Sequence, residues 1–313
     1  MENHLDAVVI GGGPAGLQAA LTLGRMHRSV VLLDSGAYRN APVEHLHNFA
    51  THDGRDPAEF RALARADLAA YSTVSVREVA ATSVAAAGSG FTVELDDGSV
   101  LAARRLVLAT GVRDTLPDKP GLAELFGTVA AHCPFCHGHE YAGGHVALLG
   151  AGPHAERLAG MLGPIAGRLT VLADGVPVEP ALADTLTRAG VTVRTEPVTG
   201  FCRSSASATV SFADGPAEEV AGLFVTTAFA QSAPFAEQLG LELLPSGCVR
   251  VDEFQRTSLP GVYAAGDLAH LEALPMPMSA VLTSAAAGLV AASAVVQDLV
   301  LAGSEVAAAQ IHR

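Results

Sequence analysis

The sequence has no tryptophan, few aromatic residues and only four cysteines among its 313 residues. Four cysteines are too few for a disulfide scaffold, and reduced thiols are typical of cytosolic proteins. The first residues carry neither a cationic segment nor a small-residue cleavage site of the secretory kind. We therefore expect a cytoplasmic protein.

Positive charge is scarce as well. Lys and Arg number 19 against 32 Asp and Glu, which gives a formal net charge of −13. A nucleic-acid backbone is bound by clustered positive charge, so nucleic acid is not an expected partner. Long apolar runs are also rare, and residues 280–296 are shorter than the roughly 20 residues that span a membrane. We expect this run to form a helix packed inside the protein, with no membrane partner.

What the sequence does contain is a long chain with ample apolar material. Half of its residues are apolar, and the glycines and prolines are spread without a short period or a low-complexity block. Disorder and fibrous structure are therefore excluded. A length of 313 residues predicts about two domains.

The first motif is a glycine-rich loop between a predicted strand and a predicted helix. Residues 5–10 form an apolar run, residues 11–16 are GGGPAG, and the next predicted strand ends at Asp34. In a dinucleotide-binding fold such a loop brings backbone and a helix N-terminus to a pyrophosphate, and the acid binds ribose hydroxyls. The residues predicted to bind a dinucleotide here are Gly11, Gly13, Pro14, Ala15, Gly16 and Asp34.

The same pattern returns 139 residues later in the chain. Residues 145–149 form an apolar run, residues 150–155 are GAGPHA, and a helical pattern and another strand follow. The sequence therefore predicts an α/β fold with two Rossmann-like units.

A third motif precedes the second loop. Cys133 and Cys136 are separated by two residues, a spacing that suits either a redox pair or half of a zinc site. Nearby imidazoles at His132, His137, His139 and His145 could supply metal nitrogens. Zinc sites usually contain a second cysteine pair, and Cys202 and Cys248 lie far apart. We therefore favour a redox pair and expect no metal.

Two further segments establish a resemblance to a known family. The sequence VYAAGDLA, with Gly266 and Asp267, resembles the second flavin motif of two-dinucleotide-binding-domain flavoproteins, and LATG ends at Gly111. With GGGPAG and the CxxC pair, the chain resembles the low-molecular-weight thioredoxin reductases over about 300 residues. The resemblance implies bound FAD, a homodimer, and an FAD domain (residues 1–115 and 247–313) split by an inserted pyridine-nucleotide-type domain (residues 116–246).

Departures from that family are informative. Thioredoxin reductases usually carry CATCDG, whereas residues 133–140 are CPFCHGHE, which resembles the FAD-dependent dithiol oxidases of gliotoxin- and holomycin-type natural products. Residues 34–54 also resemble that group. The resemblance implies that Cys136 faces the flavin, Cys133 meets the substrate, and His137 and His139 transfer protons. It adds these expected FAD contacts: Ser35, Gly36, Arg39, His47, Asn48, Ala109, Gly111, Gly266, Asp267 and Ala280.

The second loop departs from an NADPH-dependent reductase too. The strand after it leads to Asp174, where such a reductase has a basic cluster for the 2′-phosphate. An acid there suits the free ribose of NADH or no nucleotide at all, so NAD(P)H binding is doubtful.

Three functions remain open on the sequence. The favoured one is a dithiol oxidase that turns a small-molecule dithiol into a disulfide, with O2 as acceptor and H2O2 as product. The alternatives are an NAD(P)H-dependent disulfide reductase and a flavin redox sensor without turnover. The sequence does not name the dithiol.

Overall fold

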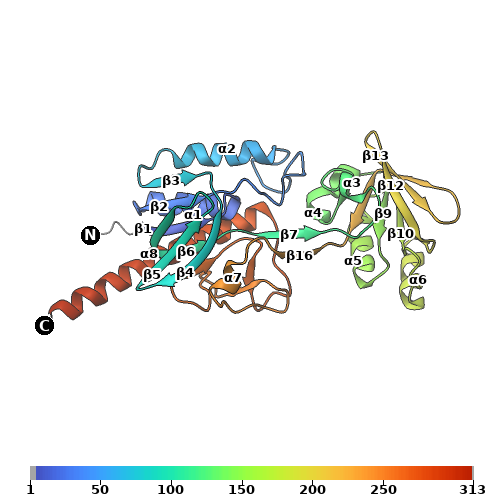
Figure 1. Cartoon of the computed structure of the whole chain (residues 1–313). Helices are drawn as coiled ribbons and strands as arrows, with labels where there is room; N and C mark the ends of the chain where they lie inside the picture. Colours follow the sequence, from blue (N-terminus) through green and yellow to red (C-terminus); the bar gives the residue numbers. More distant parts are fainter. Residues whose placement is uncertain (1–4, 312–313) are drawn as a thin grey trace. The chain divides into compact units, whose positions relative to one another are not determined.

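A computed structural model describes residues 5–311, with side chains as far as Ala302. The chain divides into two compact units (Figure 1). Unit 1 contains residues up to 39, residues 58–113 and residues from 230 onward, and unit 2 contains residues 40–57 and 114–229. Strands β7 (Val112–Thr115) and β16 (Ala228–Gln231) pair with each other where the chain crosses between the units.

Unit 1 is built on a seven-stranded sheet in the order β3-β2-β1-β6-β5-β4, with β18 also paired to β6. The pairs among β3, β2, β1, β6 and β18 are parallel, whereas β4 and β5 form an antiparallel hairpin that continues onto β6. A further parallel pair joins β17 and β19. The strands are β1 (Leu5–Ile10), β2 (Val30–Leu33), β3 (Val74–Arg77), β4 (Ala81–Ala87), β5 (Gly90–Leu95), β6 (Val100–Leu108), β17 (Val249–Val251), β18 (Val262–Ala264) and β19 (Ala269–Leu271).

The helices of unit 1 are α1 (Pro14–Arg25), α2 (Pro57–Leu68), α7 (Phe235–Gln238) and α8 (Val281–Ile311). Helix α1 follows the first glycine loop directly, and it packs against α8 from the other end of the chain. Leu23, Ala291 and Val295 are completely buried in this contact. Burying a large aliphatic side chain contributes about 1.5–3 kcal/mol, so this core fixes the start of α1 next to the start of α8.

Unit 2 is a second parallel sheet, five strands wide, in the order β11-β10-β9-β15-β8. Alternate residues of β9 enter two different cores, one beneath α5 and α6 and the other beneath α3 and an antiparallel sheet, β12-β13-β14. Its strands are β8 (Ala130–Ala131), β9 (His145–Leu149), β10 (Arg168–Leu172), β11 (Thr192–Arg194), β12 (Val198–Ser204), β13 (Ser207–Phe212), β14 (Glu218–Val220) and β15 (Gly222–Val225). Its helices are α3 (Leu122–Leu125), α4 (Pro134–His137), η1 (His139–Tyr141), α5 (Pro153–Leu162) and α6 (Pro180–Arg188).

The prediction of an α/β fold with two Rossmann-like units is confirmed. The unit boundaries differ from the expected ones in two places. Residues 40–57 belong to unit 2, because the Pro42 carbonyl lies against Gly127, and Leu46 and Arg55 bridge within the segment. Residues 230–246 belong to unit 1 rather than to the insertion, because the Gln238 amide oxygen accepts a hydrogen bond of 3.0 Å from the Val84 N–H.

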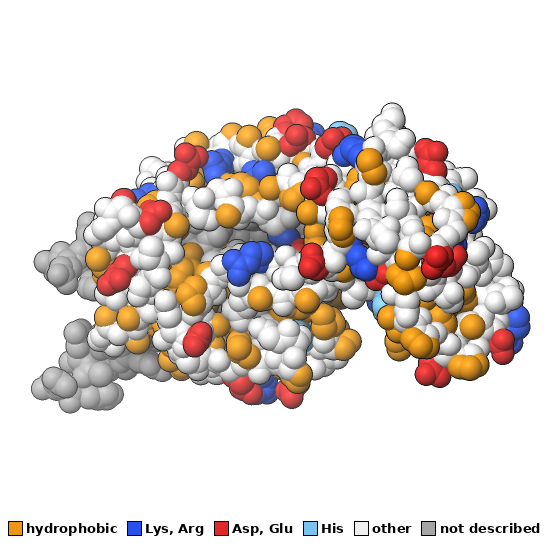
Figure 2. Space-filling view, turned by 45° about the vertical axis from the view of Figure 1, so that its right-hand side comes forward, with side chains coloured by type: hydrophobic (Ala, Val, Ile, Leu, Met, Phe, Trp, Pro, Cys, Tyr) orange, Lys and Arg blue, Asp and Glu red, His pale blue; other side chains and the backbone are white. Residues whose placement is uncertain are grey.

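Helix α8 is longer than the apolar run that the sequence suggested. Its stretch Val281–Ala302 is long and apolar enough to cross a membrane by length and composition alone. A third of that window is buried, and buried residues such as Ala291 and Val295 pack in the core that α8 shares with α1. On the face shown in Figure 2, Lys and Arg side chains lie singly or in small groups among acidic ones.

The contact between α1 and α8 leaves no room for a methyl group at Gly288, which would overlap the Ala15 carbonyl oxygen. We expect Gly288→Ala to destabilise the protein by about 1–3 kcal/mol, because backbone atoms cannot move aside as a side chain can. Gly160→Ala on α5 is the matched control. A methyl group there meets nothing within 4 Å, and the change should stabilise the helix by about 0.5–1 kcal/mol. Urea unfolding followed by circular dichroism measures both, and equal effects would contradict the packing.

Candidate functional site

The first glycine loop presents an open helix N-terminus. Gly13 precedes α1 in an extended conformation (φ −79°, ψ −177°), has no capping side chain and is followed by Pro14 at the first helical position. A methyl group on Gly13 would meet no atom within 4 Å, whereas one on Gly16 would overlap the Gly11 carbonyl. The loop is therefore tightly packed beneath and open above, which is the arrangement that admits a phosphate to backbone N–H groups.

Asp34 lies directly beneath this loop. Its carboxylate fills the place where a side chain on Gly12 would be, and the residue is only 2% exposed. It accepts hydrogen bonds from the Gly36 N–H (2.9 Å) and the Tyr38 hydroxyl (2.7 Å), and it forms an ion pair with Arg65. Burial raises the pKa of Tyr38, and its hydrogen bond to Asp34 acts in the same direction.

A cavity of about 410 Å³ opens beside this carboxylate. Its lining residues are Asp34, Ser35, Gly36, Tyr38, Arg65, Glu78, Val79, Ala80 and Asp96. Three of the predicted cofactor contacts therefore border one cavity. Arg65 was missed on the sequence, because only the fold brings α2 to the end of β2. Tyr38, four residues after Asp34, was missed too.

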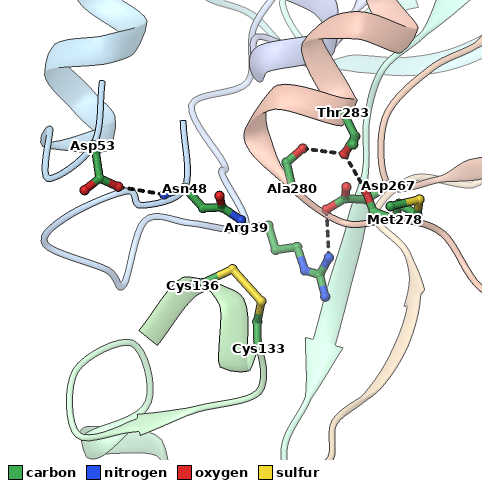
Figure 3. The surroundings of a disulfide bond; sticks show 9 residues. All are labelled: Arg39, Asn48, Asp53, Cys133, Cys136, Asp267, Met278, Ala280 and Thr283. Carbon is green, nitrogen blue, oxygen red and sulfur yellow. Dashed lines mark hydrogen bonds and ion pairs between the residues drawn. A yellow bond between two sulfur atoms is a disulfide. The ribbon is translucent and has the colours of Figure 1, made fainter. Parts of the chain in front are cut away.

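The second flavin motif forms a turn in the same unit (Figure 3). Gly266 has φ +88°, a conformation that favours glycine, and places Asp267 after β18. The Asp267 carboxylate receives a charged hydrogen bond of 2.7 Å from Arg39 and one of 3.1 Å from the Ser284 hydroxyl. Ser284 lies on α8 just after Ala280, so two segments that are distant in the sequence hold this one carboxylate.

Two more predicted contacts lie at the end of β6. The Ala109 carbonyl packs against Gly11, whose φ of +122° turns the loop, and the Ala109 N–H donates to the Ile10 carbonyl at 2.8 Å. Gly111, with φ +67°, then turns the chain into β7. Both residues thus support the loop from its own unit.

These features of unit 1 fit the FAD that the resemblance implies. An open loop at a helix N-terminus suits a pyrophosphate, the cavity at Asp34 suits an adenosine, and an acid held at a tight turn suits flavin hydroxyls. The surroundings of three residues support this fit: Gly13 at the open loop, Asp34 at the cavity and Asp267 at the tight turn.

In unit 2, Cys133 and Cys136 form a disulfide across the one-turn helix α4, with Cα atoms 5.4 Å apart (Figure 3). The expected redox pairing is confirmed. Phe135, between the two cysteines, is 67% exposed. Among the described residues no group of three or more His, Cys, Asp and Glu side chains is arranged to hold a metal ion.

His137 ends α4 in a half-buried position. Its Nδ1 is buried and has no hydrogen-bond partner among residues 5–302. Burial lowers the pKa of His137 below its ordinary value of 6.5, and the charges of His132 and His47 act in the same direction, while Glu140 opposes them. The imidazole is therefore neutral at physiological pH and can accept a proton.

The segment containing His47 lies in the same unit as the disulfide. His47 Nε2 is 3.4 Å from a Glu140 carboxylate oxygen, and its Nδ1 is 3.5 Å from Asp53. Asp53 also accepts a hydrogen bond of 2.7 Å from the Asn48 backbone N–H. His139 is exposed at the start of η1. The structure thus places His47 next to the end of the CxxC motif, a relation that sequence distance concealed.

Comparison with known proteins gives consistent matches. A family model described as pyridine nucleotide-disulphide oxidoreductase matches residues 5–288. The chain is 36% identical to the thioredoxin reductase tcpT of Claviceps purpurea, over 95% of this chain and 96% of that protein. Among solved structures, HlmI superposes with a TM-score of 0.89 at 33% identity, covering 100% of this chain and 99% of HlmI. An oxidoreductase from Agrobacterium tumefaciens gives 0.87 at 33% identity, covering 95% and 99%.

The four cysteines should differ sharply in reactivity. Cys202 is exposed, Cys248 is buried with a pKa raised chiefly by burial, and the other two are in the disulfide. A thiol reagent should therefore label mainly Cys202 in the oxidised native protein, and Cys202→Ser should abolish that fast phase. Reduction should add two reactive thiols. Rapid labelling of Cys133 or Cys136 before reduction, detected by peptide mapping, would contradict the disulfide.

Proposed function

Because the chain belongs to the pyridine nucleotide-disulphide oxidoreductase family, as a thioredoxin reductase-like, FAD-dependent disulfide oxidoreductase, we propose that it oxidises a small-molecule dithiol. In the overall reaction a dithiol and O2 give a disulfide and H2O2. Two S–H bonds are lost, one S–S bond forms, and two electrons and two protons reach oxygen. The resemblance of residues 133–140 to dithiol oxidases supports this assignment.

The observation that carries the assignment is the CPFCHGHE sequence of residues 133–140, in which His137 stands where thioredoxin reductases usually have an acid. A dithiol must lose its protons before its sulfur atoms can attack, because the thiolate is the nucleophile. A neutral imidazole next to the disulfide accepts such a proton. In a disulfide reductase the same group would return this proton to a departing thiolate, so the electron donor and not His137 separates the two functions.

The exchange proceeds in two steps at the cysteine pair. One substrate thiolate attacks Cys133 Sγ, forms a mixed disulfide and displaces the Cys136 thiolate. The second substrate thiol, deprotonated in turn, attacks the substrate sulfur of the mixed disulfide and displaces Cys133. The substrate leaves as a disulfide, and the cysteine pair holds two electrons. His137 takes the proton of the entering thiol. His139 follows two residues later, is exposed to solvent and can exchange protons with it.

FAD, when bound, supplies the two-electron acceptor that links the reduced cysteine pair to oxygen. We propose that its pyrophosphate meets Gly11, Gly13 and the start of α1, and that Asp34 binds its ribose. Arg39 and Ser284 hold Asp267 for the flavin end. The other predicted contacts remain proposals for the same group, among them His47 and Asn48, and a cytoplasmic homodimer remains a prediction.

A second candidate is an NAD(P)H-dependent disulfide reductase. The parallel sheet of unit 2 with its own glycine loop favours it, as does the name thioredoxin reductase that relatives such as tcpT carry. The cysteine pair and FAD serve electron flow in both directions, so the electron donor distinguishes the two functions.

Anaerobic flavin bleaching at about 450 nm, the usual absorbance of oxidised flavin, decides between them. We expect a small dithiol such as dithiothreitol to bleach the flavin and NADH or NADPH to leave it oxidised, with peroxide forming when air is admitted. Cys136→Ser should abolish bleaching by dithiol, whereas the matched control Cys202→Ser should not. Rapid bleaching by a nicotinamide would establish the reductase instead.

The role of His137 predicts a particular pH dependence. A base works in its deprotonated form, so the rate of flavin reduction by dithiol should rise with pH through the lowered pKa of His137, and the midpoint of that rise should lie below pH 6.5. In His137→Gln that rise should disappear and the rate should fall about 10²-fold. His45→Gln, an exposed histidine of the same unit, is the control. An unchanged profile in His137→Gln would remove His137 from the mechanism.

A further inference from the structure

The two glycine loops of the chain have nearly the same backbone. Gly152 precedes α5 at φ −84° and ψ −178°, as Gly13 precedes α1 at φ −79° and ψ −177°, and each is followed by proline. Gly150 has φ +97° and corresponds to Gly11 at φ +122°. Unit 2 therefore has the backbone of a dinucleotide site, and its side chains decide whether a dinucleotide can enter.

The space above the second loop is filled by an imidazole. A methyl group on Gly152 would lie 3.1 Å from His154 Cε1 and Nδ1, and one on Gly150 would lie 3.5 Å from His154 Nε2. At the corresponding place above Gly13 there is no atom within 4 Å. His154 occupies the position of Ala15, and its Nε2 is buried without a hydrogen-bond partner in the described part of the chain. The ring therefore lies where a pyrophosphate would approach the backbone.

The place of the ribose-binding acid is also filled. In the first loop the Asp34 carboxylate occupies the space that a side chain on Gly12 would need. The corresponding residue of the second loop is Ala151, whose methyl group takes up that space. An acid after β10 therefore has no room beneath this loop.

The residue that corresponds to Asp34 is Ala173, since the Leu33 and Leu172 carbonyls each accept a hydrogen bond from the first glycine of their loop. Asp174 is the next residue and faces elsewhere. It has φ +57°, and its two carboxylate oxygens lie 2.7 and 2.8 Å from Lys119 Nζ. One of them also accepts a 2.8 Å hydrogen bond from the Val198 N–H, and Lys119 donates to the Val198 carbonyl at 3.1 Å. The acid is thus committed to holding β12, and a ribose would have to displace both partners.

We propose that unit 2 is closed to pyridine nucleotides by its own side chains, namely His154 above the loop, the Ala151 methyl group beneath it, and the Lys119–Asp174 pair, which keeps the acid near the end of β10 from a ribose. The residues present do not fit NADH or NADPH, although the backbone would. A consequence of this closure is that electrons enter from a dithiol alone, and that consequence rests on the proposed function. The closure itself concerns binding and is tested without turnover.

The test compares binding of NAD⁺ and ADP-ribose, which cannot reduce flavin, to the FAD-loaded protein by calorimetry. The unsubstituted protein should show no saturable binding up to about 1 mM, the weak end of the affinity scale. The double variant A151G/H154A gives the second loop the GGGPA sequence of the first, and K119M added to it releases Asp174. We expect this triple variant to gain at least about tenfold in affinity for ADP-ribose.

The matched control is A151G/H154F with K119M, which keeps a ring above the loop and should gain nothing. FAD content and flavin reduction by dithiol, measured on the same samples, show that each variant is folded and report separately on the proposed function. If the triple variant does not fold, H154A alone uncovers the loop and should bind ADP-ribose where the parent does not. Submillimolar binding by the parent, or no gain in a folded H154A or triple variant, would overturn the proposal.

Discussion

The close contact between α1 and α8 is the constraint on which the flavin site depends. The Ala15 carbonyl touches Gly288, and the Ala15 side chain lies 3.1 Å from the place of a methyl group on Gly266. One small residue of α1 thus touches both the last helix and the turn that carries Asp267. Because α8 also supplies Ser284 to that carboxylate, the helix contact sets the distance between the phosphate end and the flavin end of the site. A larger residue at any of these points would separate them.

In unit 2 the half-buried His137 follows the disulfide. Burial disfavours its imidazolium, so a neutral imidazole stands after Cys136. Thioredoxin reductases usually have an acid at this position. The same disulfide chemistry can run in either direction, and a group that accepts a proton in one direction returns it in the other, so the electron donor and acceptor set the direction. His47, from a segment that the sequence assigns to the other half of the fold, lies 3.4 Å from Glu140 of the CxxC segment.

The parts of the fold and site that the sequence predicted are the local ones. The glycine loops, the acid after β2, the cysteine pair and the turn at Gly266 each consist of a few consecutive residues whose spacing fixes their geometry. What could not be predicted depends on tertiary contacts. Arg65 reaches Asp34 from another helix, Ser284 reaches Asp267 across the fold, and residues 40–57 join unit 2 through contacts such as Pro42 against Gly127. Helix α8 extends beyond the apolar run of residues 280–296, because the polar residues that follow do not interrupt it.

The two loops show why backbone geometry alone does not determine what a dinucleotide fold binds. Their φ and ψ angles before the helix agree within 5°, yet one is open and the other is covered. The difference lies in two side chains, an alanine exchanged for histidine and a glycine exchanged for alanine, at positions that leave the helix and the sheet intact. A helix N-terminus attracts anions wherever its amides are accessible, so covering those amides is sufficient to remove a ligand. The parallel sheet of unit 2 then still performs a structural task, because α5 packs against α4 and supports the segment that carries the cysteines.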